Sequence, residues 1–381
     1  MQALFKNVKI SGISSVIPTK EIDIEDEKEF YGNSDKKIAR IKEIVGLSKR
    51  RVVSKNVTAS DLCTQAASTL ISEMKINISD IDALVFVVQN PDYICPATAC
   101  IIHKNLELGA NCIAFDVNQG CAGYVYGLYI ASSLIEGGSC KKVLLCAGDT
   151  FSIHCNVKNR VTAPVFGDAG SATLLEYSPE ETSSYYSLGA DGNGYEHIII
   201  PAGGATIPFM PNENDILFED IQCGSNVTNL SDLHMDGLEI FNFTMNVVPE
   251  NIKSVLNLSG ETPETIEKLY LHQANKQIIQ TVASMSGFDV EKAPYKTVQN
   301  YGNQTIASIP CAICDDYSKE EFSKNLKVLL SGFGIGLAWG SCCLNLDNIY
   351  CSGIREFDNS VQVESRENLI SKWKKKLKGE I

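Results

Sequence analysis

The sequence lacks any apolar run long enough to cross a membrane and has comparatively little positive charge. No apolar stretch reaches the roughly 18 to 20 residues that span a bilayer, and the N-terminal segment MQALFKNVKISGISSVIP has no long apolar run after its basic residues. We therefore expect a cytoplasmic protein with no membrane span. The 33 Lys and Arg residues against 46 Asp and Glu give a formal net charge of -13, which argues against a nucleic-acid partner because a polyphosphate is bound by a positive field.

The sequence also lacks the cysteine and histidine clusters of a metal site. Most of its 14 cysteines lie in apolar segments such as KKVLLCAGD and SIPCAICDD, so we expect them to be buried, reduced and free of disulfides. Cys311 and Cys314 have the spacing of zinc ligands, but no second pair or nearby histidine completes a four-ligand site. We therefore predict no metal.

An internal repeat is the most informative feature of the layout. Residues 142–145 and 327–330 both read KVLL. A β-rich stretch, a tight turn and an apolar segment of helical length precede each copy, and a Gly-rich turn and another apolar strand follow it, APVFGDAGSATLLEY in the first half and GIGLAWGSCCLNL in the second. Strands that alternate with helices predict parallel strands covered by helices. The sequence therefore predicts an α/β fold made of two duplicated halves.

The repeat divides the chain into four parts. We predict an N-terminal half over residues 1–178, a loop-rich insertion over 179–235, a C-terminal half over 236–345 and an extension over 346–381. The extension contains ENLISKWKKKLKG, which is compatible with a basic amphipathic helix that contacts a membrane or an acidic partner. The composition favours a solvated terminal helix instead.

Three polar residues fall where strands lead into helices, which is where ligands bind in α/β folds. Cys121 lies in the small-residue turn QGCAG before an apolar helix, and the positive end of the helix dipole is expected to lower its pKa. His272, in LHQAN, is a candidate proton carrier or hydrogen-bond donor, and Asn303 is either a helix cap or a donor to a carbonyl oxygen. The repeat places Cys121 and Asn303 at equivalent turns, so a pseudo-twofold axis would bring them together. A papain-like protease also uses Cys, His and Asn, but its local sequences differ.

These segments resemble the β-ketoacyl-acyl carrier protein synthase III family of the thiolase superfamily. The resemblance rests on DVNQGCAGYVYGL, LHQANKQII, NYGNQTIASIP, VFGDAGSATLL and GFGIGLAWGS, with weaker matches at GLSKRR and MDGLEIFNF. Together these segments extend over most of residues 1 to 345. The resemblance implies a thiolase-like five-layered αβαβα fold and a homodimer. It also implies a decarboxylative Claisen condensation between an acyl thioester and a malonyl thioester carried by acyl carrier protein.

The resemblance assigns roles to individual residues. Cys121 would take the acyl group, with its oxyanion held by the backbone N–H groups of Cys121 and Ile335. His272 and Asn303 would hydrogen-bond the malonyl thioester carbonyl. No cofactor is implied beyond the acyl-CoA or acyl-carrier-protein thioesters that serve as substrates. The positions expected to contact substrate or coenzyme A are Arg160, Met235, Gly237, Phe241, Ala274 and Asn275.

Three positions depart from better-known members of the family. Arg40 stands where a Trp usually stacks on the adenine of coenzyme A, and Gln277 replaces an Arg on the helix after His272. Cys95 stands where a bulky residue lines the partner subunit's acyl pocket. The first two changes argue against acetyl-CoA as the primer, and the third predicts a roomier pocket.

Two other functions are compatible with the same residues. A non-condensing acyltransferase would move the acyl group from Cys121 to a hydroxyl or amine of a specialised metabolite, and would not need Asn303. A non-catalytic partner subunit of a heterodimer is a third hypothesis, which the intact Cys, His and Asn set disfavours. The sequence does not identify the acyl primer, the carrier that delivers it or the pathway.

Overall fold

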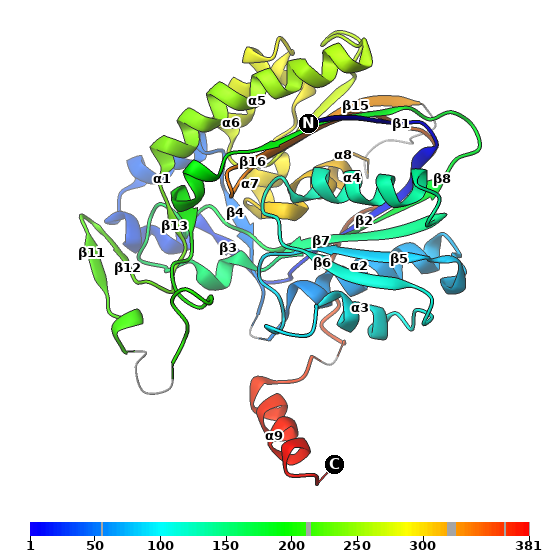
Figure 1. The fold of residues 1–381 in the computed structure, drawn as a ribbon. Coiled ribbons are helices and arrows are strands. Elements are labelled where there is room, and N and C mark those ends of the chain that lie inside the picture. The colour runs from blue at the N-terminus through cyan, green and yellow to red at the C-terminus, as the bar shows by residue number, and fades with distance from the viewer. Residues whose placement is uncertain (55, 211–214, 318–324, 362, 381) are drawn as a thin grey trace.

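Two β-sheets with helices between and outside them form the body of the protein (Figure 1). The computed structural model describes residues 1–381 except 55, 211–214, 318–324, 362 and 381. The six-stranded sheet has the order β17-β2-β8-β7-β5-β6, and the five-stranded sheet has the order β1-β9-β16-β15-β14. The strands of the first sheet are β17 (Tyr350–Glu356), β2 (Val8–Ile17), β8 (Ala169–Tyr177), β7 (Lys142–Asp149), β5 (Ala83–Val87) and β6 (Ile113–Val117). Those of the second are β1 (Gln2–Phe5), β9 (Ser184–Ala190), β16 (Ala338–Leu346), β15 (Leu326–Gly334) and β14 (Lys268–Leu271).

The helices make three layers around these sheets. Helices α4 (Gly123–Glu136) and α8 (Ser308–Tyr317) contact strands of both sheets and therefore form the middle layer. Helices α2 (Ala59–Glu73) and α3 (Ala99–Asn105) cover the outer face of the six-stranded sheet, and α5 (Gly237–Ser259) and α6 (Lys276–Met285) cover the outer side of the five-stranded sheet (Figure 1). The predicted five-layered αβαβα architecture is confirmed.

Three further α-helices and three strand pairs of the described chain lie outside these layers. They are helices α1 (Asp35–Ile44), α7 (Lys296–Tyr301) and α9 (Arg366–Leu377), and the strand pairs β3 (Glu21–Asp23) with β4 (Lys49–Arg51), β10 (Ile198–Ile199) with β13 (His234–Met235), and β11 (Ile221–Cys223) with β12 (Asn226–Thr228). Among the described residues, no helix is both long and apolar enough to cross a membrane.

The two KVLL segments occupy equivalent strands of the two sheets. The first lies in β7, which is parallel to β5 and antiparallel to β8, and the second lies in β15, which is parallel to β14 and antiparallel to β16. The outer partner is antiparallel in both cases, β2 beside β8 and β9 beside β16. The two halves thus share one pairing pattern.

The predicted boundaries of the four parts do not coincide with the edges of the sheets. Strand β9 lies within the segment 179–235 that we predicted to be an insertion, yet it pairs with β16 inside the five-stranded sheet. Strand β17 lies in the predicted extension, yet it pairs with β2 in the six-stranded sheet. Both strands mix polar and apolar residues, so their place in a sheet depends on distant partners and not on their own pattern.

Burial on both faces explains the apolar strands. Val143, Leu144 and Leu145 are fully buried because β7 has helices on either side. Helix α4 lies close to this sheet because small residues face it: a methyl group added at Gly127 would lie 2.7 Å from the Leu145 side chain. Tight packing of α4 fixes where its N-terminus points, and this end of the helix carries the site.

Candidate active site

Cys121 lies in the turn between β6 and α4, two residues before the helix begins. The turn is closed by a 2.6 Å hydrogen bond from the Gly123 N–H to the Gly120 carbonyl, and the cysteine is 5% exposed. The end of β15 packs directly against it, since a methyl group at Gly334 would lie 2.9 Å from Cys121 Cβ and 3.0 Å from Sγ. Only a residue without a side chain allows this approach.

The electrostatics of Cys121 differ from our expectation. Burial raises the pKa of the thiol to about 12, and the Asp149 carboxylate raises it further. Hydrogen bonds from the backbone N–H groups of Ile335 and of Cys121 itself lower the pKa, but they do not offset burial. The prediction that the helix start lowers this pKa was wrong, because desolvation of the thiolate outweighs the helix terminus. The thiol is therefore neutral at pH 7, and two backbone N–H groups point toward its sulfur.

His272 and Asn303 lie together. His272 directly follows β14, and Asn303 lies between α7 and the short 3-10 helix Thr305–Ala307. The Asn303 Nδ2 atom is 3.5 Å from His272 Nε2, and both residues are buried. The Asn303 side-chain oxygen accepts a 2.9 Å hydrogen bond from the Thr305 N–H. This hydrogen bond fixes the orientation of the Asn303 side chain, with its amide nitrogen directed toward His272.

The end of β15 connects this pair to Cys121. The Ser331 carbonyl accepts a 2.8 Å hydrogen bond from the backbone N–H of His272, and the Phe333 ring stands edge-on to the imidazole at 5.6 Å. Gly334 touches Cys121, and Ile335 directs its N–H to the sulfur. Five consecutive residues, 331–335, therefore contact both the cysteine and the histidine.

Burial makes His272 a neutral side chain. It lowers the pKa of the imidazole to about 4, an effect that a hydrogen bond to the backbone of Thr305 reduces only in part. At neutral pH the ring is uncharged and carries one N–H donor. With the Asn303 amide beside it, the site offers two neutral donors in one place.

Asn303 is held by the other half of the chain. It forms an isolated parallel bridge with Phe166, with 2.8 and 2.9 Å hydrogen bonds between its backbone and that of Val165 and Gly167. Gly302 has a φ of 82°, and a methyl group there would lie 3.0 Å from three neighbouring atoms. The glycine before Asn303 therefore lets this turn approach residues 165–167 of the other half.

Five of the six predicted substrate-contacting residues lie in or next to α5 and α6. Met235 and Ile335 pack on one apolar cluster that includes Phe151 and Phe166. Asn275 caps α6 by accepting a 2.8 Å hydrogen bond from the Ile278 N–H. Gly237 opens α5, and Phe241 and Ala274 pack on the α5–α6 core. The sixth position, Arg160, lies close enough to Tyr31 to lower the pKa of that tyrosine against the effect of burial.

The three positions that depart from the family pattern are exposed. Arg40 on α1 and Gln277 on α6 both face solvent. The two helices meet at Gly46, where an added methyl group would lie 2.6 Å from the Lys276 side chain. Cys95 is exposed within the segment 93–96, in which Ile94 is 101% exposed.

Asp149 is a residue near the site that our sequence analysis missed. It is fully buried at the end of β7, and its carboxylate accepts hydrogen bonds from the Gln89 N–H at 3.1 Å and the Thr150 N–H at 3.0 Å. Burial raises its pKa to about 7. The signal was present in KVLLCAGD, where an acidic residue ends an otherwise apolar strand and therefore marks the strand end as polar.

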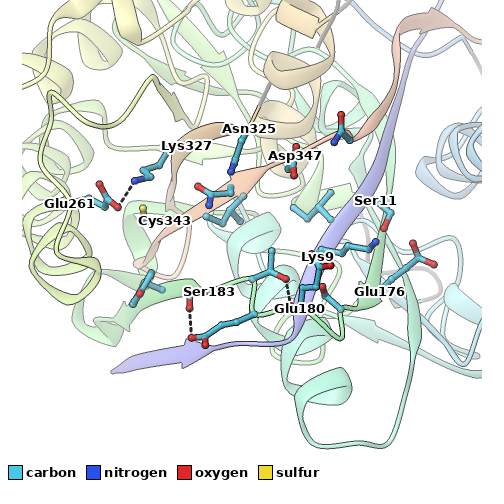
Figure 2. A pocket seen from close by; sticks show the side chains of 18 of the residues that line it. Lys9, Ser11, Glu176, Glu180, Ser183, Glu261, Asn325, Lys327, Cys343 and Asp347 are labelled. Carbon is cyan, nitrogen blue, oxygen red and sulfur yellow. Dashed lines mark hydrogen bonds and ion pairs between the residues drawn. The ribbon is translucent and has the colours of Figure 1, made fainter. Parts of the chain in front are cut away.

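A large hollow lies near the start of β15, at the opposite end of that strand from Cys121; Figure 2 shows the side chains that line the hollow. It has a volume of about 840 Å³, and Lys9, Glu176, Glu261, Lys327 and Asp347 contribute charges to its wall. Lys327 is the second residue of β15 whereas Gly334 ends it, so the hollow is roughly 20 Å from Cys121 at a strand rise of about 3.3 Å per residue. It is not part of the Cys121 site.

Over the described part of the chain, no group of three or more His, Cys, Asp or Glu side chains is arranged to hold a metal ion. Cys311 and Cys314 are both buried in α8, and Cys314 Sγ lies 3.4 Å from Cys351 Sγ.

Comparison with known proteins gives the same family over both halves. Residues 115–192 match the family 3-Oxoacyl-[acyl-carrier-protein (ACP)] synthase III, and residues 256–346 match the C-terminal family of the same synthase. A Campylobacter jejuni protein provisionally named 3-oxoacyl-[acyl-carrier-protein] synthase 3 is 36% identical over 93% of this chain and 98% of its own length. The β-ketoacyl-[acyl-carrier-protein] synthase III of Clostridium tetani is 34% identical over 88% of this chain and 97% of its own.

A solved structure is similar to the whole body of the protein. The 3-oxoacyl-(acyl-carrier protein) synthase of Burkholderia xenovorans superimposes with a TM-score of 0.85 at 32% sequence identity, over 93% of this chain and 99% of that one.

Proposed function

The chain belongs to the 3-oxoacyl-[acyl-carrier-protein] synthase III family of condensing acyltransferases, and from this premise we propose that Cys121, His272 and Asn303 carry out the condensation. The single observation that carries the proposal is the position of residues 331–335, which contact Cys121 on one side and His272 on the other. One strand end thereby sets the distance between an acyl-carrying sulfur and two neutral hydrogen-bond donors.

In the first step, the sulfur of Cys121 attacks the carbonyl carbon of an acyl thioester. A C–S bond to the enzyme forms, the carbonyl oxygen becomes an oxyanion, and collapse breaks the old C–S bond and releases the donor thiol. The backbone N–H groups of Cys121 and Ile335 are directed toward the sulfur and would hold the oxyanion. Because the resting thiol has a pKa of about 12, its proton must leave as the attack proceeds, and it ends on the departing sulfur of the donor thiol.

In the second step, a malonyl thioester loses carbon dioxide. The electron pair of the broken C–C bond moves onto the thioester carbonyl and gives an enolate. The His272 N–H and the Asn303 amide would donate to that oxygen. The enolate carbon then attacks the acyl-cysteine, forms the new C–C bond and expels the Cys121 sulfur. Neutral donors suit this step because negative charge is present on the oxygen only transiently.

The substrates follow from the relatives, whose names specify an acyl carrier protein. We propose malonyl-acyl carrier protein as extender and an acyl-CoA or acyl-carrier-protein thioester as primer, with no cofactor besides these. Arg160, Met235 and Phe241 would line the approach to Cys121, together with Gly237, Ala274 and Asn275. The exposed Arg40 and Gln277 alter the expected coenzyme A contacts, so the primer is proposed to be other than acetyl-CoA.

We also propose a homodimer. Strand β6 is an edge of the six-stranded sheet, and its apolar residues Ile113, Phe115 and Val117 are exposed or half-buried. The neighbouring segment 93–96 exposes Ile94 and Cys95. An exposed apolar sheet edge is a site at which a strand of another chain can pair, and a second copy would place Cys95 at the partner's acyl pocket. A cytoplasmic location is proposed as well, and cell fractionation tests it.

Intact-mass spectrometry after incubation with a panel of acyl-CoA and acyl-carrier-protein donors tests the nucleophile. We expect a mass gain of one acyl group that is lost in Cys121→Ala and retained in Cys100→Ala, which removes an exposed cysteine. Failure of every donor to acylate the wild-type protein would refute the assignment.

The Asn303→Ala variant separates condensation from simple acyl transfer. Removing one donor to a developing oxyanion costs on the order of 10² to 10³ in rate, so condensation should fall by that factor while acylation of Cys121 continues. The exposed Asn300→Ala variant is the matched control. Normal product formation by Asn303→Ala would favour transfer to a hydroxyl or amine instead.

A further inference from the structure

Helix α9 lies outside the condensing body of the protein. It covers Arg366–Leu377, has no buried residue, and projects away from the layers in Figure 1. Its side chains therefore contribute little to the stability of the body, although Ser365 caps its N-terminus through a 3.2 Å hydrogen bond from the Asn368 N–H. A capped helix with no buried residue requires an explanation in terms of what it contacts.

The apolar residues of α9 form one exposed stripe. At about 100° per residue, Leu369, Ile370, Trp373 and Leu377 fall within an arc of about 100°. Ile370 is 46% exposed, Trp373 45% and Leu377 83%. An exposed stripe of three or four large apolar side chains on one helix face is typical of a binding surface.

Lysines border the stripe on both sides. On the same helical projection, Lys374 and Lys376 flank the apolar arc, and the Lys376 ammonium lies 5.3 Å from the centre of the Trp373 ring. Residues 366–380 contain six Lys or Arg and two Glu, a net charge of about +4. Because the whole chain has a net charge of -13, the other residues together carry about -17. The helix is thus a basic element attached to an acidic body.

We propose that α9 binds the surface of an anionic lipid bilayer, lying in the plane of the interface. Its apolar stripe would enter the boundary between headgroups and acyl chains, with Trp373 at headgroup level. The flanking lysines would lay their aliphatic stems along the apolar region and extend their ammonium groups to lipid phosphates. At twelve residues, or about 18 Å, the helix lies on a membrane and does not span it.

The charge distribution favours this occupant over an acidic protein. A bilayer satisfies the apolar stripe and the bordering lysines together, whereas a purely acidic surface would pair the lysines and leave Leu377 and Trp373 in water. The acidic body is repelled by the same lipids, so α9 is the contact and the body stays in the aqueous phase. The proposal is independent of the condensation chemistry.

Vesicle flotation with the full chain tests the proposal. Vesicles of phosphatidylglycerol and phosphatidylcholine in equal parts should retain the protein, and vesicles of phosphatidylcholine alone should not. At the energy expected per lysine near an anionic surface, Lys374→Ser/Lys376→Ser should weaken binding roughly 30-fold. The matched control Lys36→Ser/Lys37→Ser, which removes two exposed lysines from α1, should bind as wild type.

Tryptophan emission provides a second measurement. The chain has two tryptophans, and Trp339 lies in β16, where it packs on Phe243. A blue shift on adding anionic vesicles should therefore come from Trp373 and should disappear in Trp373→Phe, which still floats. An unchanged melting temperature in each variant verifies that the body is folded.

Three results would overturn the proposal. The first is that the wild-type protein does not float with anionic vesicles, or that the Lys374→Ser/Lys376→Ser variant floats as well as the Lys36→Ser/Lys37→Ser control. The second is that the full chain binds acyl carrier protein through α9 and does not bind the vesicles. The third is a change of oligomeric state on truncation after residue 360 with no change in flotation.

Discussion

Gly334→Ala tests whether the end of β15 positions Cys121. The added methyl group would lie 2.9 Å from Cys121 Cβ and 3.0 Å from Sγ, where ordinary contacts are about 3.8 Å, so strand and cysteine must separate by nearly 1 Å. Gly334 also has a φ of 152°, which side chains rarely adopt. Overpacking of this kind costs about 1 to 3 kcal/mol, less than the stability of a typical domain, so the variant should fold.

The expected effect is kinetic. A displacement of about 1 Å at a reacting atom costs on the order of 10² in rate, so acylation of Cys121 followed by intact-mass time courses should slow by about that factor. Gly260→Ala is the control, because Gly260 also has a positive φ but no atom within 4 Å of the added methyl group. A Gly334→Ala variant with normal melting temperature and normal acylation rate would refute the argument that this contact sets the geometry.

Three further outcomes follow from the electrostatics. Because the pKa of Cys121 is about 12, its alkylation by iodoacetamide should accelerate about tenfold per pH unit between about pH 7 and 10, and a plateau near neutral pH would contradict this. Burial lowers the pKa of His272 from 6.5 to about 4, so the contribution of this neutral side chain to folding stability is full above pH 6.5 and is lost as the pH falls toward 4. The difference in free energy of unfolding between wild type and His272→Asn should therefore shrink by about 3 kcal/mol over that window. An unchanged difference in denaturation midpoints would be evidence against it. Glu27→Gln should destabilise the fold by about 3 kcal/mol or more in urea unfolding, because it leaves the Arg50 guanidinium, whose side chain is 5% exposed, without its carboxylate. Glu25→Gln breaks an exposed ion pair and should cost less than about 1 kcal/mol, so equal effects of the two changes would count against burial as the cause.

Local patterns were enough to predict the fold class. The two KVLL segments are strands buried on both faces, and such strands must be apolar wherever they lie along the chain. The turn before α4 could be recognised because the glycines on either side of Cys121 can adopt the conformations of a tight turn and permit close packing. Strands β9 and β17 could not be placed in this way, since strands that mix polar and apolar residues take their position from the partners that pair with them.

The sequence by itself determined which residues stand at the strand ends: a cysteine before an apolar helix, a histidine after a strand and an asparagine after a glycine. Only the tertiary structure decided how these residues behave. It brought Asn303 Nδ2 to 3.5 Å from His272 and placed β15 against Cys121. It also reversed the expected shift of the Cys121 pKa, because burial depends on every element packed around the thiol, whereas the helix terminus that we considered is a property of one segment.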